Sequence, residues 1–177
     1  MKITSIKQQV KNPERASIFI EGNYAFSLNL NELVAEKLKI GQELDDAEAK
    51  RLKKLSDDGK LKSRALEWVM NRPRSIREFK DYLYRKKAEP EQIQSLIENF
   101  TGRGYLSDMK FAIWLTELRR RIGKSERAIR SELASKGIDR EIVDEVMQDG
   151  GDELSRLKAL VAKKQKLPRY IADPQKL

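Results

Sequence analysis

The sequence predicts a mainly α-helical protein. Tandem three-helix repeats, similar to winged-helix or helix-turn-helix units, are expected to form an elongated, curved solenoid behind a small N-terminal β meander. Three observations predict this class: the first 30 residues hold short runs of branched and aromatic residues, later segments place apolar residues at helical spacing, and one apolar pattern recurs after 50 residues. Charged residues are 37% of the 177 residues, so narrow apolar stripes on many helices are expected rather than one thick core.

Residues 1–30 are predicted to form the β meander. Two strands are expected at Ala16–Ile20 and Tyr24–Leu28, which are rich in β-branched and aromatic residues, with a weaker third strand at Ile3–Val10. A turn between the first two is supplied by Glu21-Gly22-Asn23, because glycine and asparagine tolerate positive φ. The pattern therefore indicates a small antiparallel sheet.

From Asn31 the pattern becomes helical. Asp45 and Glu48 have the spacing of a capping box, in which each side chain accepts a backbone hydrogen bond at a helix start. The residues Ser56-Asp57-Asp58-Gly59 are typical of a loop and predict a break in the helix, after which the basic part of the chain begins. Residues 1–60 are therefore predicted to be one domain, a β meander with short helices.

A repeat occupies the chain after residue 60. The pattern recurs with a constant shift of 50 residues and no gap, and each matched position is apolar or suits a helix start. The matched pairs are Leu61/Phe111, Ala65/Leu115, Trp68/Leu118, Ser75/Ser125, Phe79/Ile129, Leu83/Leu133, Glu89/Asp139, Ile93/Val143, Leu96/Val146 and Ile97/Met147. The predicted division is 61–108 for the first three-helix repeat, 109–151 for the second, and 152–177 for an incomplete third repeat that holds only its first helix.

Signals for helix starts and stops agree with this division. Ser75 precedes Glu78 as in a capping box, and Pro90 suits the first turn of a helix, where a missing N–H costs nothing. Gly123 and Gly137 are expected at helix ends, because glycine accepts the left-handed conformation found there. The third unit carries a start signal for a second helix close to the end of the chain, which suggests that the chain is cut within this repeat.

No catalytic or metal-binding arrangement is found in the sequence. The chain has no Cys and no His, which excludes thiol nucleophiles, imidazole bases and Cys/His zinc sites. A phosphate-binding loop is not indicated by Gly123-Lys124-Ser125, because such a loop needs a glycine at position 118, where the chain has Leu118. Acidic pairs such as Asp144-Glu145 lie among charged surface positions. A non-enzymatic protein without cofactors is expected.

Positive charge is concentrated in the repeats. The net charge is +9, and residues 1–60 carry 11 basic and 10 acidic side chains, whereas residues 61–177 carry 26 and 18. A part this basic is expected to meet nucleic acid, an acidic protein surface or an anionic membrane.

Stacked repeats are predicted to align two clusters of cations into a basic track along one side. Arginine suits such a track because its planar guanidinium binds phosphate or carboxylate bidentately. Ordinary solvated helix faces are the alternative interpretation. The predicted basic track consists of Arg72, Arg74, Arg77, Lys80, Lys86, Lys87, Arg119, Arg120, Arg121, Lys124, Arg127 and Arg130.

Several short motifs of the repeats occur in a recognisable order. They are Gly104-Tyr105-Leu106-Ser107-Asp108 followed by Phe111-Ala112, Arg72-Pro73-Arg74-Ser75 with Phe79 and Leu83, Gly123 with Ile129 and Leu133, and Lys136-Gly137-Ile138. Their order and spacing resemble the RecX family, bacterial regulators of the RecA recombinase, over about residues 61–170. Two departures are Ser107, where the family often has an acidic residue, and the incomplete third unit.

The resemblance implies a non-enzymatic regulator of homologous recombination and DNA repair, linked to the SOS response. Such a protein lodges in the groove of a RecA filament on single-stranded DNA and inhibits the recombinase and its ATP hydrolysis. A solenoid suits this role because its extended surface can contact several filament subunits. No apolar stretch approaches the roughly 18 residues of a membrane-spanning helix, so a cytoplasmic monomer without a membrane partner is expected.

Two other classes of protein are compatible with the residues. The first is a direct DNA-binding helical module without a recombinase target, because helix pairs joined at Gly123 and Gly137 resemble helix-turn-helix units. The second, a basic membrane-surface protein, is less favoured, since its apolar stripes are needed to build the repeats. Titrations of naked DNA and of RecA-coated DNA distinguish the first alternative from a filament regulator.

Overall fold

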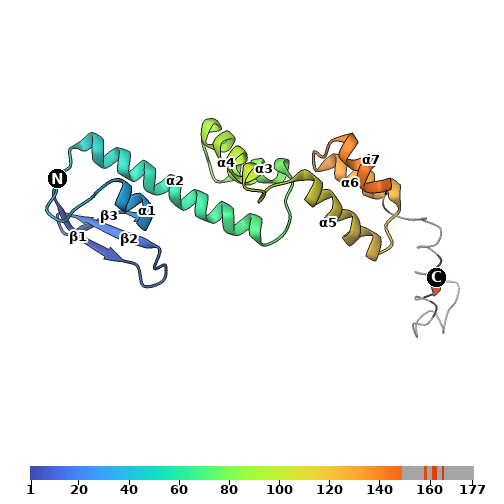
Figure 1. The fold of residues 1–177 in the computed structure, drawn as a ribbon, viewed down its shortest axis with the longest axis horizontal. Helices are drawn as coiled ribbons and strands as arrows, with labels where there is room; N and C mark the ends of the chain where they lie inside the picture. The colour runs from blue at the N-terminus through green and yellow to red at the C-terminus, as the bar shows by residue number, and fades with distance from the viewer. Residues whose placement is uncertain (149–157, 159–160, 163–164, 166–177) are drawn as a thin grey trace. The chain divides into compact units, whose positions relative to one another are not determined.

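Three strands and seven helices follow one another along the part of the chain that the computed structural model describes (Figure 1). This part comprises residues 1–148, 158, 161–162 and 165. The chain divides into two compact units, of which the first is Met1–Glu67 and the second begins at Trp68. The predicted incomplete third repeat, residues 152–177, lies outside the described residues apart from those few positions.

The N-terminal sheet has the predicted meander topology. Its strands are β1 (Ile3–Gln8), β2 (Arg15–Ile20) and β3 (Asn23–Asn29), antiparallel in the order β1-β2-β3. Ile18 lies at the centre, opposite Ile6 on β1 and Phe26 on β3. The turn between β2 and β3 places both Glu21 and Gly22 at positive φ, as a tight hairpin turn requires.

Two helices complete the first unit, α1 (Leu30–Ala35) and the longer α2 (Asp46–Met70). The predicted capping box at the start of α2 is confirmed, because the Glu48 amide donates to Asp45 Oδ1 at 2.7 Å and the Asp45 amide donates to Glu48 Oε2 at 3.2 Å. The core between sheet and helix contains the buried residues Ile3, Ile18, Ile20, Phe26, Leu28, Leu44 and Leu52. The sheet therefore buries one set of alternating side chains.

The predicted break at Ser56–Gly59 is wrong, because α2 continues through it. Ser56 is fully buried, and its hydroxyl accepts a hydrogen bond from the Ser27 amide at 3.4 Å. A Cβ at Gly59 would lie 2.6 Å from Glu32 Oε1, so glycine serves close packing here rather than a turn. The helix thus crosses residue 60, and the finer predicted domain boundaries stay predictions.

The second unit repeats its helices at the predicted shift. Its helices after the end of α2 are α3 (Ile76–Arg85), α4 (Pro90–Gly102), α5 (Asp108–Arg121), α6 (Glu126–Ser135) and α7 (Arg140–Gln148). Both bounds of α6 lie 50 residues after those of α3. Ser75 and Ser125 cap these two helices, and each hydroxyl accepts a backbone N–H of the first turn. Equal spacing in the sequence thus gives equal helices.

The buried residues of the two repeats also correspond. Phe79 and Leu83 on α3 are fully buried, as are Ile129 and Leu133 on α6. In the first repeat the rings of Phe79 and Phe100 stack with centroids 5.2 Å apart. In the second repeat one core joins α5, α6 and α7, with Phe111, Leu115, Val143, Val146 and Met147 buried.

Helices α3 and α6 end in the same backbone geometry. The Ala88 amide donates to the Leu83 carbonyl at 3.2 Å, and the Ile138 amide donates to the Leu133 carbonyl at the same distance. Lys87 and Gly137 take the left-handed conformation at equivalent places, with φ values of 59° and 78°. Gly123 also has a φ of 78°, so the predicted helix ends at both glycines are confirmed.

Gly137→Ala is expected to lower the free energy of unfolding by about 1–2 kcal/mol, since alanine at positive φ is strained. The added Cβ would also lie 2.8 Å from Cδ of Arg77. Gly102→Ala is the matched control, because a Cβ at Gly102 meets nothing within 4 Å. Urea denaturation should show a loss for the first variant and none for the second; equal stabilities would contradict the expected strain.

Candidate functional site

Four cations of the first repeat have a cationic counterpart in the second. The pairs at the shift of 50 residues are Arg74/Lys124, Arg77/Arg127, Lys80/Arg130 and Lys86/Lys136. Because α3 and α6 share their bounds under this shift, the members of each pair occupy equivalent positions on or beside these helices. The charge pattern is therefore repeated together with the apolar pattern.

Five arginines of the predicted track form ion pairs within the chain. One of them is bidentate: Arg119 Nε and Nη2 donate to the Glu132 carboxylate at 2.7 and 2.6 Å. These hydrogen bonds lower the pKa of Glu132. The other pairs are Arg72–Glu78 at 3.0 Å, Arg120–Glu126 at 3.7 Å, Arg121–Glu117 at 3.9 Å, and Arg130–Asp144. Part of the predicted positive charge is thus already offset within the protein.

Six other cations of the track have exposed side chains and form no ion pair with an acidic residue of the described part. They are Arg77, Lys80, Lys86, Lys87, Lys124 and Arg127. Two of them lie near tyrosine rings, with the Lys80 amine 5.9 Å from the Tyr84 centroid and the Lys86 amine 5.5 Å from the Tyr82 centroid. These six side chains can donate to an external phosphate or carboxylate without first breaking an internal pair.

Arg74 differs from the other track residues because it is partly buried and has no carboxylate partner among the residues that the structure describes. Its guanidinium carbon lies 3.8 Å from the centroid of the Trp68 ring, a cation–π arrangement. Nε is buried and has no hydrogen-bond partner in the described part of the chain. Burial, with a smaller contribution from the charge of Arg72, lowers the pKa of Arg74.

Three polar contacts beside these cations join the start of α3 to the start of α5 and to the end of α6. The Ser75 hydroxyl donates to the Lys136 carbonyl at 3.0 Å, and the Ile76 amide donates to Asp108 Oδ1 at 2.8 Å. The Lys136 amine lies 3.1 Å from Glu78 Oε1, so Glu78 binds one cation from each repeat. The junction therefore fixes the first turn of α3 against the end of α6 and the start of α5.

The two junction carboxylates have opposite pKa shifts. Burial raises the pKa of Glu78, but hydrogen bonds from Arg72 and Lys136 outweigh it, so the pKa is lowered. Burial raises the pKa of Asp108, and the hydrogen bond from the Ile76 amide offsets this only in part. Low pH therefore weakens the ion pairs of Glu78, whereas it favours the burial of Asp108 in its neutral form.

Two junction cations were missed by the sequence analysis. Lys136 could have been found, because the shift of 50 residues carries Lys86 onto it. Lys110 has no such counterpart signal, and only the fold places it beside Arg72 and Arg74, around one cavity of about 340 Å³. The described residues contain no group of three His, Cys, Asp or Glu side chains that could hold a metal ion.

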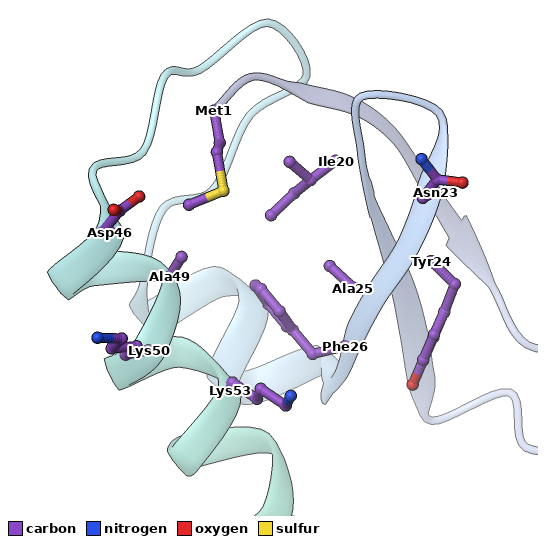
Figure 2. Close-up of a pocket in the computed structure, with 10 residues that line it drawn as sticks. All are labelled: Met1, Ile20, Asn23, Tyr24, Ala25, Phe26, Asp46, Ala49, Lys50 and Lys53. Carbon is purple, nitrogen blue, oxygen red and sulfur yellow. The ribbon is translucent and has the colours of Figure 1, made fainter.

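A separate pocket of about 440 Å³ lies within the N-terminal unit, between β3 and the start of α2 (Figure 2). Ile20, Ala25 and Phe26 line it from the sheet, and Lys50 and Lys53 line it from the helix. The arrangement offers apolar walls, two cations and one carboxylate, that of Asp46 at the start of α2. No helix in the described residues is long and apolar enough to cross a membrane.

The repeated helices and their repeated charges define a class of protein, a helical-repeat protein with exposed cations at equivalent positions. Residues 1–45 match the family described as the regulatory protein RecX N-terminal domain, and residues 107–147 match the second three-helix domain of RecX. The chain belongs to the RecX family of regulatory proteins.

Curated relatives carry the name regulatory protein RecX. One from Listeria welshimeri is 35% identical over 154 residues, which is 86% of this chain and 57% of the relative. One from Bacillus subtilis is 35% identical over 146 residues, 82% of this chain and 55% of the relative. The chain thus spans a little over half the length of these relatives.

Two solved structures share the fold. A crystal structure of regulatory protein RecX superimposes with a TM-score of 0.72 at 24% identity, covering 92% of this chain and 81% of that structure. RecX from Lactobacillus salivarius gives a TM-score of 0.56 at 22% identity, over 66% of this chain and 77% of that structure. The mainly helical fold with a three-stranded N-terminal sheet is therefore confirmed.

Proposed function

We propose that the chain is a non-enzymatic regulator of homologous recombination and DNA repair. It binds in the groove of a RecA filament on single-stranded DNA and inhibits the recombinase and its ATP hydrolysis. Membership of a family of regulatory proteins supports the regulatory role. The observation that carries the binding proposal is the repetition of exposed cations on α3 and α6, with Arg77 and Lys80 equivalent to Arg127 and Arg130.

Repeated cations suit a repeating partner. A filament presents identical acidic groups and phosphates at regular intervals, so two cationic helices at equivalent positions can make the same contact twice. Each exposed pair alone contributes little, about 0–1 kcal/mol, but linked contacts act together through a high effective concentration. Charge complementarity raises the association rate and sets the register of binding more than it raises affinity.

The decisive variant replaces four exposed, unpaired cations by glutamine: Arg77, Lys80, Lys124 and Arg127. We expect inhibition of RecA ATP hydrolysis on single-stranded DNA to weaken by at least tenfold, with the far-UV circular dichroism unchanged. Arg119 and Arg130 are left in place, because their ion pairs with Glu132 and Asp144 join neighbouring helices. The change then tests external contacts rather than stability.

A matched control removes the same charge elsewhere. Glutamine at Lys11, Lys39, Lys54 and Lys62, four exposed lysines of the first unit, should change inhibition less than twofold. Full inhibition by the variant of the second unit would refute the proposed role of the track. Equal losses in both variants would also contradict it, since they would reflect net charge alone.

The alternative, a direct DNA-binding module, predicts a different titration. Phosphate binding by six cations gives a slope of about −5 in a log–log plot of duplex affinity against salt, and no preference for RecA-coated over naked DNA. A filament regulator should bind RecA-coated single strands more tightly than the same strands alone at each salt concentration.

A further inference from the structure

A pocket beside the start of α5 is lined by three cations, and not all of their hydrogen-bond donors have partners within the described part of the chain. Its volume is about 340 Å³, and its lining includes Arg72, Arg74, Tyr105 and Lys110. We call it the junction pocket. None of its described lining residues is acidic, although the chain as a whole has 28 acidic residues. The cavity is near the small end of the roughly 300–1,000 Å³ range of ligand sites.

The cations of the junction pocket differ in how much of their charge is available. Arg72 is already bound to the Glu78 carboxylate at 3.0 Å. Arg74 has no carboxylate partner, its Nε is buried without an acceptor in the described part, and one face of its guanidinium is covered by Trp68. Lys110 donates one hydrogen bond to the Gly104 carbonyl at 3.1 Å, which leaves two of its protons for another acceptor.

A partly desolvated arginine without an anion is an unfavourable arrangement, because burial of a charge costs free energy that a partner must offset. An anion between Arg74 and Lys110 would provide that partner. Stacking of Arg74 on Trp68 holds the guanidinium plane in place before a ligand arrives.

Exposed apolar groups beside these cations indicate which anion fits. Tyr105 is 41% exposed and Met70 is 65% exposed, and both line the junction pocket. A nucleic-acid base stacks on an exposed aromatic ring while its phosphate is held by neighbouring cations. Bases inside a duplex are already stacked on each other, so only a single strand can use Tyr105 in this way.

We propose that the junction pocket binds one nucleotide of single-stranded nucleic acid, with a phosphate between Arg74 and Lys110 and the base against Tyr105. The inference extends the proposed function, in which single-stranded DNA lies within the bound filament. In this inference the junction pocket binds the DNA, and the exposed cations on α3 and α6 bind the filament protein. Each of the two assignments can therefore be refuted without refuting the other.

The test uses two variants of the full chain, Tyr105→Leu and Lys110→Gln, with Arg85→Gln as control. Arg85 is an exposed cation of the same unit that does not line the junction pocket. The probes are a fluorescent oligo-dT strand, a duplex of equal length and polyglutamate. Arg74 is left unchanged because it packs on Trp68, and circular dichroism verifies that each variant is folded.

We expect Tyr105→Leu to weaken oligo-dT binding at least fivefold, the lower end for loss of one stacked base, and to leave duplex binding within twofold. Lys110→Gln should lower the magnitude of the oligo-dT salt slope by about 0.7, the value for one phosphate contact to a single strand. Arg85→Gln should change oligo-dT affinity less than twofold at moderate salt.

A second readout is local to the junction pocket. In a Trp114→Phe background Trp68 is the remaining tryptophan of the chain, and a phosphate bound to Arg74 should change its emission as oligo-dT is added. Unchanged emission overturns the proposal. It is also overturned if both pocket variants bind oligo-dT as tightly as the Arg85→Gln control. A selective loss of polyglutamate binding also overturns it, because the junction pocket would then fit an acidic protein segment.

The same variants separate this proposal from the proposed function. RecA inhibition that persists in the pocket variants while oligo-dT binding is unchanged overturns only the assignment of the junction pocket. Loss of oligo-dT binding in the pocket variants, together with full inhibition by the four-cation variant, supports the junction pocket and refutes the filament contact of the track.

Discussion

Leu83→Ala and Leu133→Ala are expected to lower the free energy of unfolding by similar amounts, about 2–5 kcal/mol each. Both leucines are fully buried, and both occupy the last turn of equivalent helices. The backbone around them also matches, since the amides of Lys86 and Lys136 donate to their carbonyls at 3.0 Å. The large loss follows from the removed transfer free energy and the cavity that remains.

Urea denaturation followed by tryptophan fluorescence measures these losses. Both tryptophans, Trp68 and Trp114, belong to the second unit, so their emission reports the unit that contains the two leucines. Ile122→Ala is the control, because Ile122 is 61% exposed and its truncation should cost less than about 0.5 kcal/mol. A difference of more than about 2 kcal/mol between the two leucine variants would mean that the repeats pack differently.

The repeat was predictable because helix geometry and burial act locally. An apolar stripe at helical spacing, a serine at each start and a left-handed residue at each end together define a helix. When the same set recurs after 50 residues, the same helices follow, and α3 and α6 agree at both bounds. Ile122 is an exception: it continues the apolar spacing of α5, yet it lies one residue beyond the helix and is exposed.

The break expected at Ser56–Gly59 shows where composition misleads. Serine, aspartate and glycine are typical of turns because they compete with helical hydrogen bonds or lack a side chain. In α2 the hydroxyl of Ser56 accepts a hydrogen bond from the Ser27 amide of β3, and a Cβ at Gly59 would lie too close to Glu32 of α1. Such a requirement comes from a neighbour far along the chain, so no local pattern reports it.

Charge was predictable in amount but not in pairing. The excess of cations in the repeats is visible in the sequence, and so is the correspondence of Arg77 with Arg127. The pairing of Arg119 with Glu132, 13 residues away on another helix, requires the packing of α5 against α6. The junction pocket has the same origin, because Arg74 and Lys110 line one cavity only through the packing of α5 after the first repeat.

Glu78→Gln and Asp108→Asn are expected to change the pH dependence of unfolding in opposite directions. The pKa of Glu78 in the folded protein lies below its ordinary value of 4.5. The stability that its carboxylate contributes is therefore complete above pH 4.5 and is lost as the pH falls through the folded pKa. Asp108 has a folded pKa above its ordinary value of 3.8. Its ionisation therefore reduces stability as the pH rises through that interval.

Removing each carboxylate should produce a distinct profile. Glu78→Gln leaves Arg72 and Lys136 without their shared anion, and we expect a loss of about 1.5–3 kcal/mol at pH 7, the range for hydrogen bonds to charged groups. This loss should shrink as the pH falls, because wild-type Glu78 is then protonated as well. Asp108→Asn keeps an oxygen to accept the Ile76 amide but cannot ionise, so its stability relative to wild type should improve as the pH rises from 3 to 7.

These profiles can be measured by urea denaturation of the two variants and the wild type at several pH values between 3 and 7. Parallel curves for all three proteins would show that neither carboxylate is coupled to folding through the junction. Opposite trends would show that the charged form of Glu78 stabilises the junction, whereas the charged form of Asp108 destabilises it because the carboxylate is desolvated. As the pH rises toward 7, the ion pairs of Glu78 with Arg72 and Lys136 then raise the free energy of unfolding. Ionisation of the buried Asp108 lowers it over the same range.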